Sequence, residues 1–155
     1  MAGWKAGVAL LLIASQWGAV TAQPPPKDPN KYVPGLGDLM ESLQVQHGKL
    51  WFAAEAGNWP LAAYTVDALK EGIADMAVLR PRYKGESIVE MLNGLTAEPL
   101  DALATAVEAK DSAGFASAYD ALTNGCNVCH QNHGYGFIVL QRPTAPAMSN
   151  QRFAP

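Results

Sequence analysis

Between residues 36 and 80 the hydrophobic side chains recur at steps of three and four, the spacing that places them on one face of an α-helix. The first stripe comprises Leu36, Leu39, Met40, Leu43, His47, Leu50, Trp51 and Ala54. Gly57 ends this predicted helix, and Asn58 can cap a second helix that tolerates Pro60 in its first turn. The second stripe, bounded by Pro81, comprises Trp59, Ala62, Ala63, Val66, Leu69, Ile73 and Met76.

The stretch that follows has a weaker helical pattern. Residues 85–94 predict one short helix at most. Thr96 can then cap a third helix, with Pro99 still in its first turn. The apolar stripe of that helix comprises Leu100, Leu103, Ala106 and Val107.

We predict a fourth helix that begins at a cap formed by Asp111 or Ser112. Its apolar stripe leads into the two cysteines. That stripe comprises Phe115, Ala118, Tyr119 and Leu122. Residues 137–140 have a strand-like composition without an evident partner strand, so we expect residues 137–155 to form an extended arm on the helices. Four helices with short links and no β-rich region predict an all-α fold, an antiparallel four-helix bundle over residues 36–136.

The N-terminus has the pattern of a secretory signal peptide. A positively charged start with Lys5 precedes an apolar run over residues 6–14, and Val20-Thr21-Ala22 is a small-residue cleavage pattern. The alternative is a membrane anchor, but the apolar run is shorter than the roughly 20 residues of a spanning helix. We therefore expect cleavage after residue 22, a proline-rich lead-in over residues 23–35 and a periplasmic protein with no stable membrane insertion.

Composition narrows the function classes further. The 155 residues suffice for one domain, and 49% hydrophobic with 16% charged residues is an ordinary globular balance. The formal net charge is −3, so no broad basic surface is available for nucleic acid. No Ser/His/Asp set, phosphate loop or zinc spacing stands out, and we do not expect an enzyme.

The two cysteines carry the strongest functional signal. Cys126 and Cys129 are followed at once by His130, and C-x-x-C-H is the attachment signature of c-type haem. The spacing places both sulfurs one helical turn apart, so that each can form a thioether link to a haem vinyl group while His130 binds the iron. We expect the other ring nitrogen of His130 to be held by a backbone carbonyl or a similar acceptor. The alternatives are a disulfide and a thioredoxin-like redox pair, whose βαβ pattern is absent.

Several residues are candidates for the sixth ligand of the iron. Met40 and His47 are seven residues apart on the first stripe, so only one of them can face the iron. Either side chain can instead be a core residue. His133 lies one turn beyond His130 and is expected to be exposed, and Met148 can reach the iron only if the arm folds over the pocket. The aromatic residues expected to wall the haem include Trp51 and Tyr119.

Four helices with C-x-x-C-H near the end of the last helix resemble the cytochrome c prime class and its low-spin relatives. The resemblance covers residues 36–133. Cytochrome c prime has a five-coordinate iron, whereas its low-spin relatives place a methionine of the first helix on the iron, and Met40 matches that position. The aromatic segment from His47 to Trp59 and the long arm after Gly134 depart from the family and indicate a divergent branch.

These observations lead to one expected function and two alternatives. The expected function is electron transfer between periplasmic redox partner proteins by one covalently bound haem c. The first alternative is a five-coordinate protein that binds NO or CO, as cytochrome c prime does. The second is a haem subunit of a larger oxidoreductase, with residues 142–155 as a docking segment. The resemblance also implies a possible homodimer formed through the first two helices.

Overall fold

The computed structural model describes residues 32–146 and 150–155. The expected signal peptide, most of the lead-in and Met148 lie outside the described residues. Within them the chain forms four helices and two very short strands, which confirms the predicted all-α class. In chain order these are α1 (Leu36–Glu55), α2 (Trp59–Leu79), β1 (Arg82–Tyr83), β2 (Glu86–Ser87), α3 (Ile88–Ala109) and α4 (Ser112–Asn132). None of the described helices has both the length and the hydropathy needed to span a membrane.

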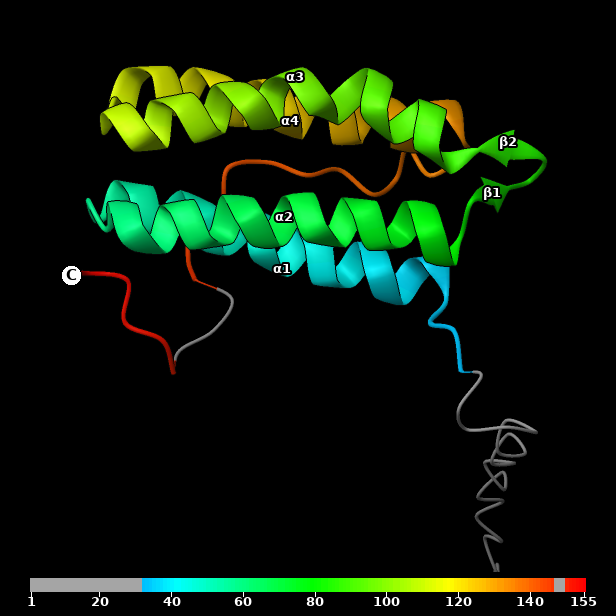
Figure 1. The fold of residues 1–155 in the computed structure, drawn as a ribbon, viewed down its shortest axis with the longest axis horizontal. Coiled ribbons are helices and arrows are strands. Elements are labelled where there is room, and N and C mark those ends of the chain that lie inside the picture. The colour runs from blue at the N-terminus through cyan, green and yellow to red at the C-terminus, as the bar shows by residue number, and fades with distance from the viewer. Residues whose placement is uncertain (1–31, 147–149) are drawn as a thin grey trace, which may run out of the picture. The chain divides into compact units, whose positions relative to one another are not determined.

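The helices pack in chain order, each beside the next. α1 lies on α2, α2 on α3, and α3 on α4, whereas the backbones of α1 and α4 are further apart and these two helices meet through aromatic side chains. Successive helices run in opposite directions, and the segment that follows α4 runs back between the α1–α2 pair and the α3–α4 pair (Figure 1). Arg142 on this segment stacks its guanidinium 4.6 Å from the ring centre of Trp51 on α1. The returning segment therefore reaches α1 as well as α4.

The predicted caps of the second and fourth helices are confirmed. The Asn58 side chain accepts a hydrogen bond of 3.2 Å from the Leu61 amide at the start of α2. The Asp111 side chain accepts one of 3.0 Å from Ala113 at the start of α4. Each cap satisfies an amide group that has no partner within its own helix. Gly134 follows α4 with φ of +82°, a left-handed conformation that glycine adopts without steric cost and that turns the chain back.

The predicted break before Thr96 is wrong, because α3 is one continuous helix from Ile88 to Ala109. Its cap is Ser87, whose hydroxyl accepts a hydrogen bond of 3.3 Å from the Glu90 amide. The Thr96 hydroxyl donates to the Leu92 carbonyl one turn earlier, at 2.7 Å, and so does not cap a helix. Leu92, Thr96 and Leu100 are all buried, and this burial stabilises the helix through the stretch that contains Pro99.

A two-stranded hairpin precedes α3 and was not predicted. Arg82 pairs with Ser87 and Tyr83 with Glu86 in antiparallel register. Lys84 and Gly85 form its two-residue turn with φ of +49° and +92°, the left-handed values that such turns require. Strands of two residues are too short to show an alternating pattern in the sequence.

The main hydrophobic core lies between the helices and consists mostly of aliphatic and aromatic side chains. Its fully buried members include Leu50, Val66, Leu103 and Tyr119. A second, smaller cluster consists of Met76, Ile88 and Leu92, against which Met40 packs.

Candidate functional site

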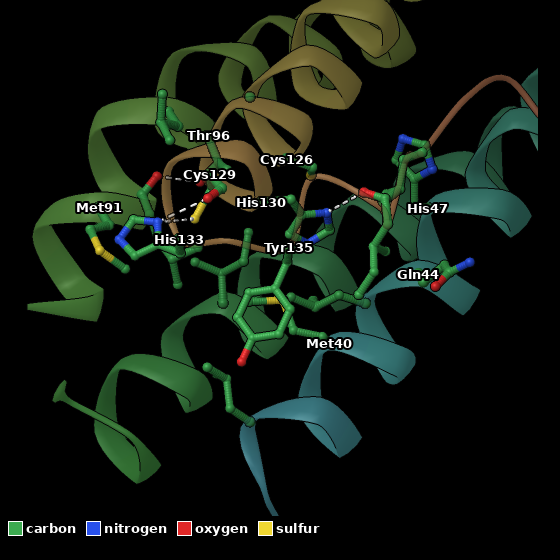
Figure 2. Close-up of a pocket in the computed structure, with 18 of the residues that line it drawn as sticks. Met40, Gln44, His47, Met91, Thr96, Cys126, Cys129, His130, His133 and Tyr135 are labelled. Atoms are coloured by element: carbon green, nitrogen blue, oxygen red, sulfur yellow. Dashed lines mark hydrogen bonds between the residues drawn. The ribbon is translucent and has the colours of Figure 1, made fainter. Parts of the chain in front are cut away.

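A cavity of about 700 Å³ opens between the helices near the C-terminal end of α4. All four helices, Tyr83 of the hairpin and the segment after α4 contribute to its wall, and most of the side chains are apolar (Figure 2). The apolar members of the wall include Leu36, Leu43, Leu69, Ile73, Ile88, Leu92, Leu95 and Leu122. A cavity of this size and lining is typical of a small-molecule or cofactor site.

The cysteines and the histidine of the C-x-x-C-H signature lie together on the wall of this cavity. Cys126, Cys129 and His130 all line it, and both cysteines are free thiols (Figure 2). The residue before them, Gly125, lies against the backbone of α3, where an added Cβ atom would come within 2.4 Å of the Leu95 carbonyl oxygen. Pro99 has no amide hydrogen to bond this carbonyl, so the two helices can approach closely beside the signature.

The His130 ring is held by the backbone, as the sequence predicts. Its Nδ1 atom lies 2.9 Å from the carbonyl oxygen of Ile138 (Figure 2). A carbonyl can only accept, so Nδ1 carries the hydrogen and Nε2 is the unprotonated nitrogen of the neutral ring. Nε2 has no hydrogen-bond partner among the described residues, which leaves it available to bind a metal.

Both thiols are stabilised in their protonated form. Burial, and next the nearby Cys129, raise the pKa of Cys126 to about 11. Burial, followed by the charge of Glu86, also raises the pKa of Cys129. Thiol–disulfide exchange needs a thiolate, and reactive C-x-x-C pairs have lowered pKa values. This environment is therefore unlike that of a thioredoxin-like redox pair.

His47 lines the cavity, but both of its ring nitrogens are already bonded to side chains of α4. Nε2 lies 2.8 Å from the Thr123 hydroxyl, and Nδ1 lies 2.9 Å from the Tyr119 hydroxyl. Burial lowers the pKa of His47 to about 4, so the ring is neutral at pH 7. The structure thus gives His47 a structural environment and does not present it as a free ligand.

Met40 lies on the cavity wall, as does a second methionine that the sequence analysis did not consider. Met40 comes from α1 and Met91 from α3 (Figure 2). Met91 lies in the segment for which only a short helix was predicted, and no local pattern there marks it as a cavity residue.

The structure does not bring Trp51 and Tyr119 onto the cavity wall. Tyr119 is fully buried in the main core, with its ring centre 4.3 Å from that of His47 and 5.0 Å from that of Trp51. Of the three rings of His47, Trp51 and Tyr119, only the imidazole of His47 lines the cavity. The two residues were expected at the wall as large aromatic side chains, but both belong to the main hydrophobic core.

The expectation that His133 is exposed is wrong, because its side chain is only 14% exposed and lines the cavity. Its Nδ1 lies 2.9 Å from the Cys129 carbonyl, and its Nε2 lies 2.8 Å from a carboxylate oxygen of Glu86. Both partners are acceptors, so the ring makes both bonds only as the doubly protonated imidazolium. These bonds, the one to Cys129 first and the one to Glu86 next, raise the pKa of His133.

A tyrosine pair that sequence reasoning missed also lines the cavity. Tyr83 of β1 and Tyr135 after α4 share a hydrogen bond between their hydroxyl groups. The Lys84 ammonium lies 5.3 Å and 5.2 Å from their ring centres, within the range of a cation–π contact. With the contact between Glu86 and His133, this pair joins the hairpin to the end of α4. The residues are far apart in sequence, so no local pattern marks the contact.

Comparison with protein-family models, with curated proteins and with solved structures gave no match. Among the described residues, no group of three or more His, Cys, Asp and Glu side chains is arranged to hold a metal ion by itself. The C-x-x-C-H signature and the cavity are therefore the features that bear on the chemistry of the site.

Proposed function

We propose that this chain is a periplasmic c-type cytochrome with one haem attached to Cys126 and Cys129 and its iron bound by His130. One observation carries the proposal. Cys126, Cys129 and His130 belong to the wall of one apolar cavity, and Nδ1 of the His130 ring already donates to a backbone carbonyl. An imidazole held in this way is the usual arrangement of a metal-binding histidine.

The residues at the cavity fit a haem. About 700 Å³ lies within the 300–1,000 Å³ range of ligand sites. The apolar walls suit a porphyrin face, and the polar side chains are few enough to act as specific contacts. The raised pKa values of both thiols disfavour thiolate-dependent exchange, and the C-x-x-C-H spacing is the one that haem attachment uses.

When bound, the haem supplies the one-electron couple of its iron. In the proposal the helices form an antiparallel four-helix bundle of the cytochrome c prime type, and the chain supplies the axial ligands and excludes water. His130 and Met40 would hold the iron, because both line the cavity and Met40 has no competing polar partner among the described residues. A methionine ligand raises the reduction potential relative to a second histidine. We therefore favour electron transfer between periplasmic redox proteins.

A second function is favoured by the position of Met40. Met40 also packs against the small cluster of Met76, Ile88 and Leu92. If it stays in that cluster, the sixth position of the iron faces apolar side chains and can take NO or CO. A haem subunit of a larger oxidoreductase is a third possibility, to which no contact of the described residues points.

The optical spectrum of the ferrous protein, made in cells that attach haem c, separates the two leading functions. The electron carrier predicts a low-spin spectrum that does not change when CO is added. A high-spin spectrum that shifts on CO addition would instead favour gas binding. The full-length chain should be used, because the segment after α4 contributes Ile138 and Leu140 to the cavity.

A further inference from the structure

The segment after α4 supplies the group that holds His130. This segment, residues 135–142, begins with a turn in which the Tyr135 amide bonds the His130 carbonyl at 2.7 Å and the Ile138 amide bonds the Tyr135 carbonyl at 2.8 Å. The Ile138 carbonyl then accepts the Nδ1 hydrogen of His130 at 2.9 Å. The orientation of the ring therefore depends on the position of this returning segment.

Asn127 directly follows Cys126 in the C-x-x-C-H signature. Its side chain fixes the returning segment at Leu140, two residues beyond Ile138. Its side-chain nitrogen donates to the Leu140 carbonyl at 2.9 Å, and its side-chain oxygen accepts from the Leu140 amide at 2.8 Å. One amide side chain thus satisfies both backbone groups of Leu140, as a neighbouring strand would.

This clamp accounts for the strand-like composition of residues 137–140 in the absence of a partner strand. Ile138 and Leu140 line the cavity, while Phe137 and Val139 are 79% and 68% exposed. The side chains therefore alternate as they do in a strand. The neighbouring anchor is Arg142, whose guanidinium makes two hydrogen bonds to the Asp120 carboxylate at 2.7 and 2.6 Å and also stacks on Trp51. Arg142 lies four residues beyond Ile138, so the clamp by Asn127 at Leu140 is the nearer constraint on the Ile138 carbonyl.

We propose that Asn127 is a positioning residue for His130, acting through the returning segment 135–142. It keeps Leu140 on α4, and Leu140 keeps the Ile138 carbonyl two residues earlier against Nδ1. The inference rests on the proposed function, because it assigns a role to a residue of the haem signature. It goes beyond that function by linking the signature to the C-terminal segment.

The test compares the holoprotein with Asn127→Ala and with Asn124→Ala. Asn124 lies on the same helix and is exposed, so it is a matched control.

A carbonyl partner on Nδ1 makes the imidazole a stronger donor to the iron, which favours the ferric state. Asn127→Ala should therefore raise the reduction potential by about 30 mV. For a one-electron couple this is about a threefold change in the equilibrium constant of reduction. Exchange of the Nδ1 hydrogen with solvent should become about tenfold faster, because two hydrogen bonds are lost.

Asn127→Leu serves as the second variant if the alanine variant does not fold. It has nearly the size of asparagine and adds no charge but removes both hydrogen bonds to Leu140, so it should shift both quantities in the same direction as the alanine variant. The inference is overturned if the potential of the Asn127 variants equals that of Asn124→Ala, whatever the exchange rate.

Failure of the proposed function gives a different result. If the chain carries no haem, the proposed function is wrong. The role of Asn127 can then still be tested on the haem-free, full-length chain. Ring ¹⁵N shifts should then show His130 as the Nδ1–H tautomer in the parent chain and in Asn124→Ala, and as a mixture of tautomers in Asn127→Ala. The same tautomer in all three proteins would overturn the inference.

Discussion

The imidazole of His47 takes part in a closed set of buried hydrogen bonds. The Thr123 hydroxyl donates to the Tyr119 carbonyl at 2.8 Å, so it must accept from His47, whose Nε2 therefore carries the hydrogen. Nδ1 then accepts from the Tyr119 hydroxyl, which also lies 3.0 Å from the His47 carbonyl. Burial raises the pKa of Tyr119, so its hydroxyl stays a donor. These bonds connect α1 to α4 beside the packing of Trp51 on Tyr119.

Replacing His47 by leucine should lower the free energy of unfolding by about 2 kcal/mol at pH 7, because Thr123 and Tyr119 lose a buried partner. The variant should also lose a dependence on pH. The folded pKa of about 4 lies below the unfolded value of 6.5, so the unfolded chain binds more protons between these values. The parent protein should therefore lose stability as pH falls from 6.5 to 4, with a contribution from His47 of up to about 1.4 kcal/mol per pH unit.

Denaturant unfolding of parent and variant at several pH values checks this dependence. The difference between the two proteins separates the contribution of His47 to the free energy of unfolding from that of the carboxylates. An equal slope in both proteins would contradict the structural role. A changed haem spectrum in the leucine variant would show instead that His47 binds the iron.

Met40 is the residue on which the proposed coordination depends. Met40→Ala should convert a low-spin ferrous spectrum into one that shifts when CO is added, because the sixth position is then open. Met91→Ala is the control, since Met91 lines the same cavity from α3 and is assigned no ligand role. A spectrum unchanged by Met40→Ala would contradict the assignment, and a change confined to Met91→Ala would transfer it to α3.

At the scale of elements, the contact between α3 and α4 decides how the haem signature is presented. Pro99 leaves the Leu95 carbonyl without its usual helical partner, and Gly125 lies against that carbonyl. The lack of a side chain at Gly125 lets the two helix backbones approach directly before Cys126. This close approach explains why the chain has a glycine inside α4, where glycine itself disfavours the helix.

Gly125→Ala should therefore lower the free energy of unfolding by about 1–3 kcal/mol and reduce the yield of haem-loaded protein, because the added Cβ forces the helices apart. Gly94→Ala on α3 is the matched control. A Cβ there meets no atom within 4 Å, so this variant should gain up to about 1 kcal/mol from helix propensity. Thermal unfolding of both variants checks the pair, and equal effects would contradict the close contact.

The helices differ in how well the sequence predicts them. α2 and α4 start at the predicted caps, Asn58 and Asp111, because capping is a local interaction that residue type and spacing reveal. α3 was predicted to begin near Thr96, because a threonine followed by a proline is typical of a helix start. Burial of Leu92 and Leu100 outweighs that local preference, and burial is a property of the tertiary structure.

At the scale of the whole molecule, the local part of the candidate site could be predicted and the long-range part could not. The spacing of Cys126, Cys129 and His130 on one helix follows from the sequence alone. The partners that complete the site come from distant segments: His47 bonds Thr123 across 76 positions, and His133 bonds Glu86 across 47. The composition of residues 137–140 indicates an extended segment, but the clamp by Asn127 appears only in three dimensions.

The returning segment and the hairpin also give the cavity its cover. Ile138 and Leu140 close one part of the wall, and Tyr83 with Tyr135 forms another. At the far end of the helices, Asn58 donates to the Phe153 carbonyl at 2.9 Å, and Phe153 packs on Phe52. Both parts of the C-terminal chain that the structure describes are thus engaged with the helices, which argues for keeping this chain intact in every test.

The intact mass of the exported, denatured protein tests the haem assignment most directly. We expect a mature chain heavier by one haem. The added mass should be lost when both Cys126 and Cys129 are replaced by serine and kept when Asn124 is replaced by alanine. A mature chain of unmodified mass, or one lighter by two hydrogens because the cysteines form a disulfide, would contradict it.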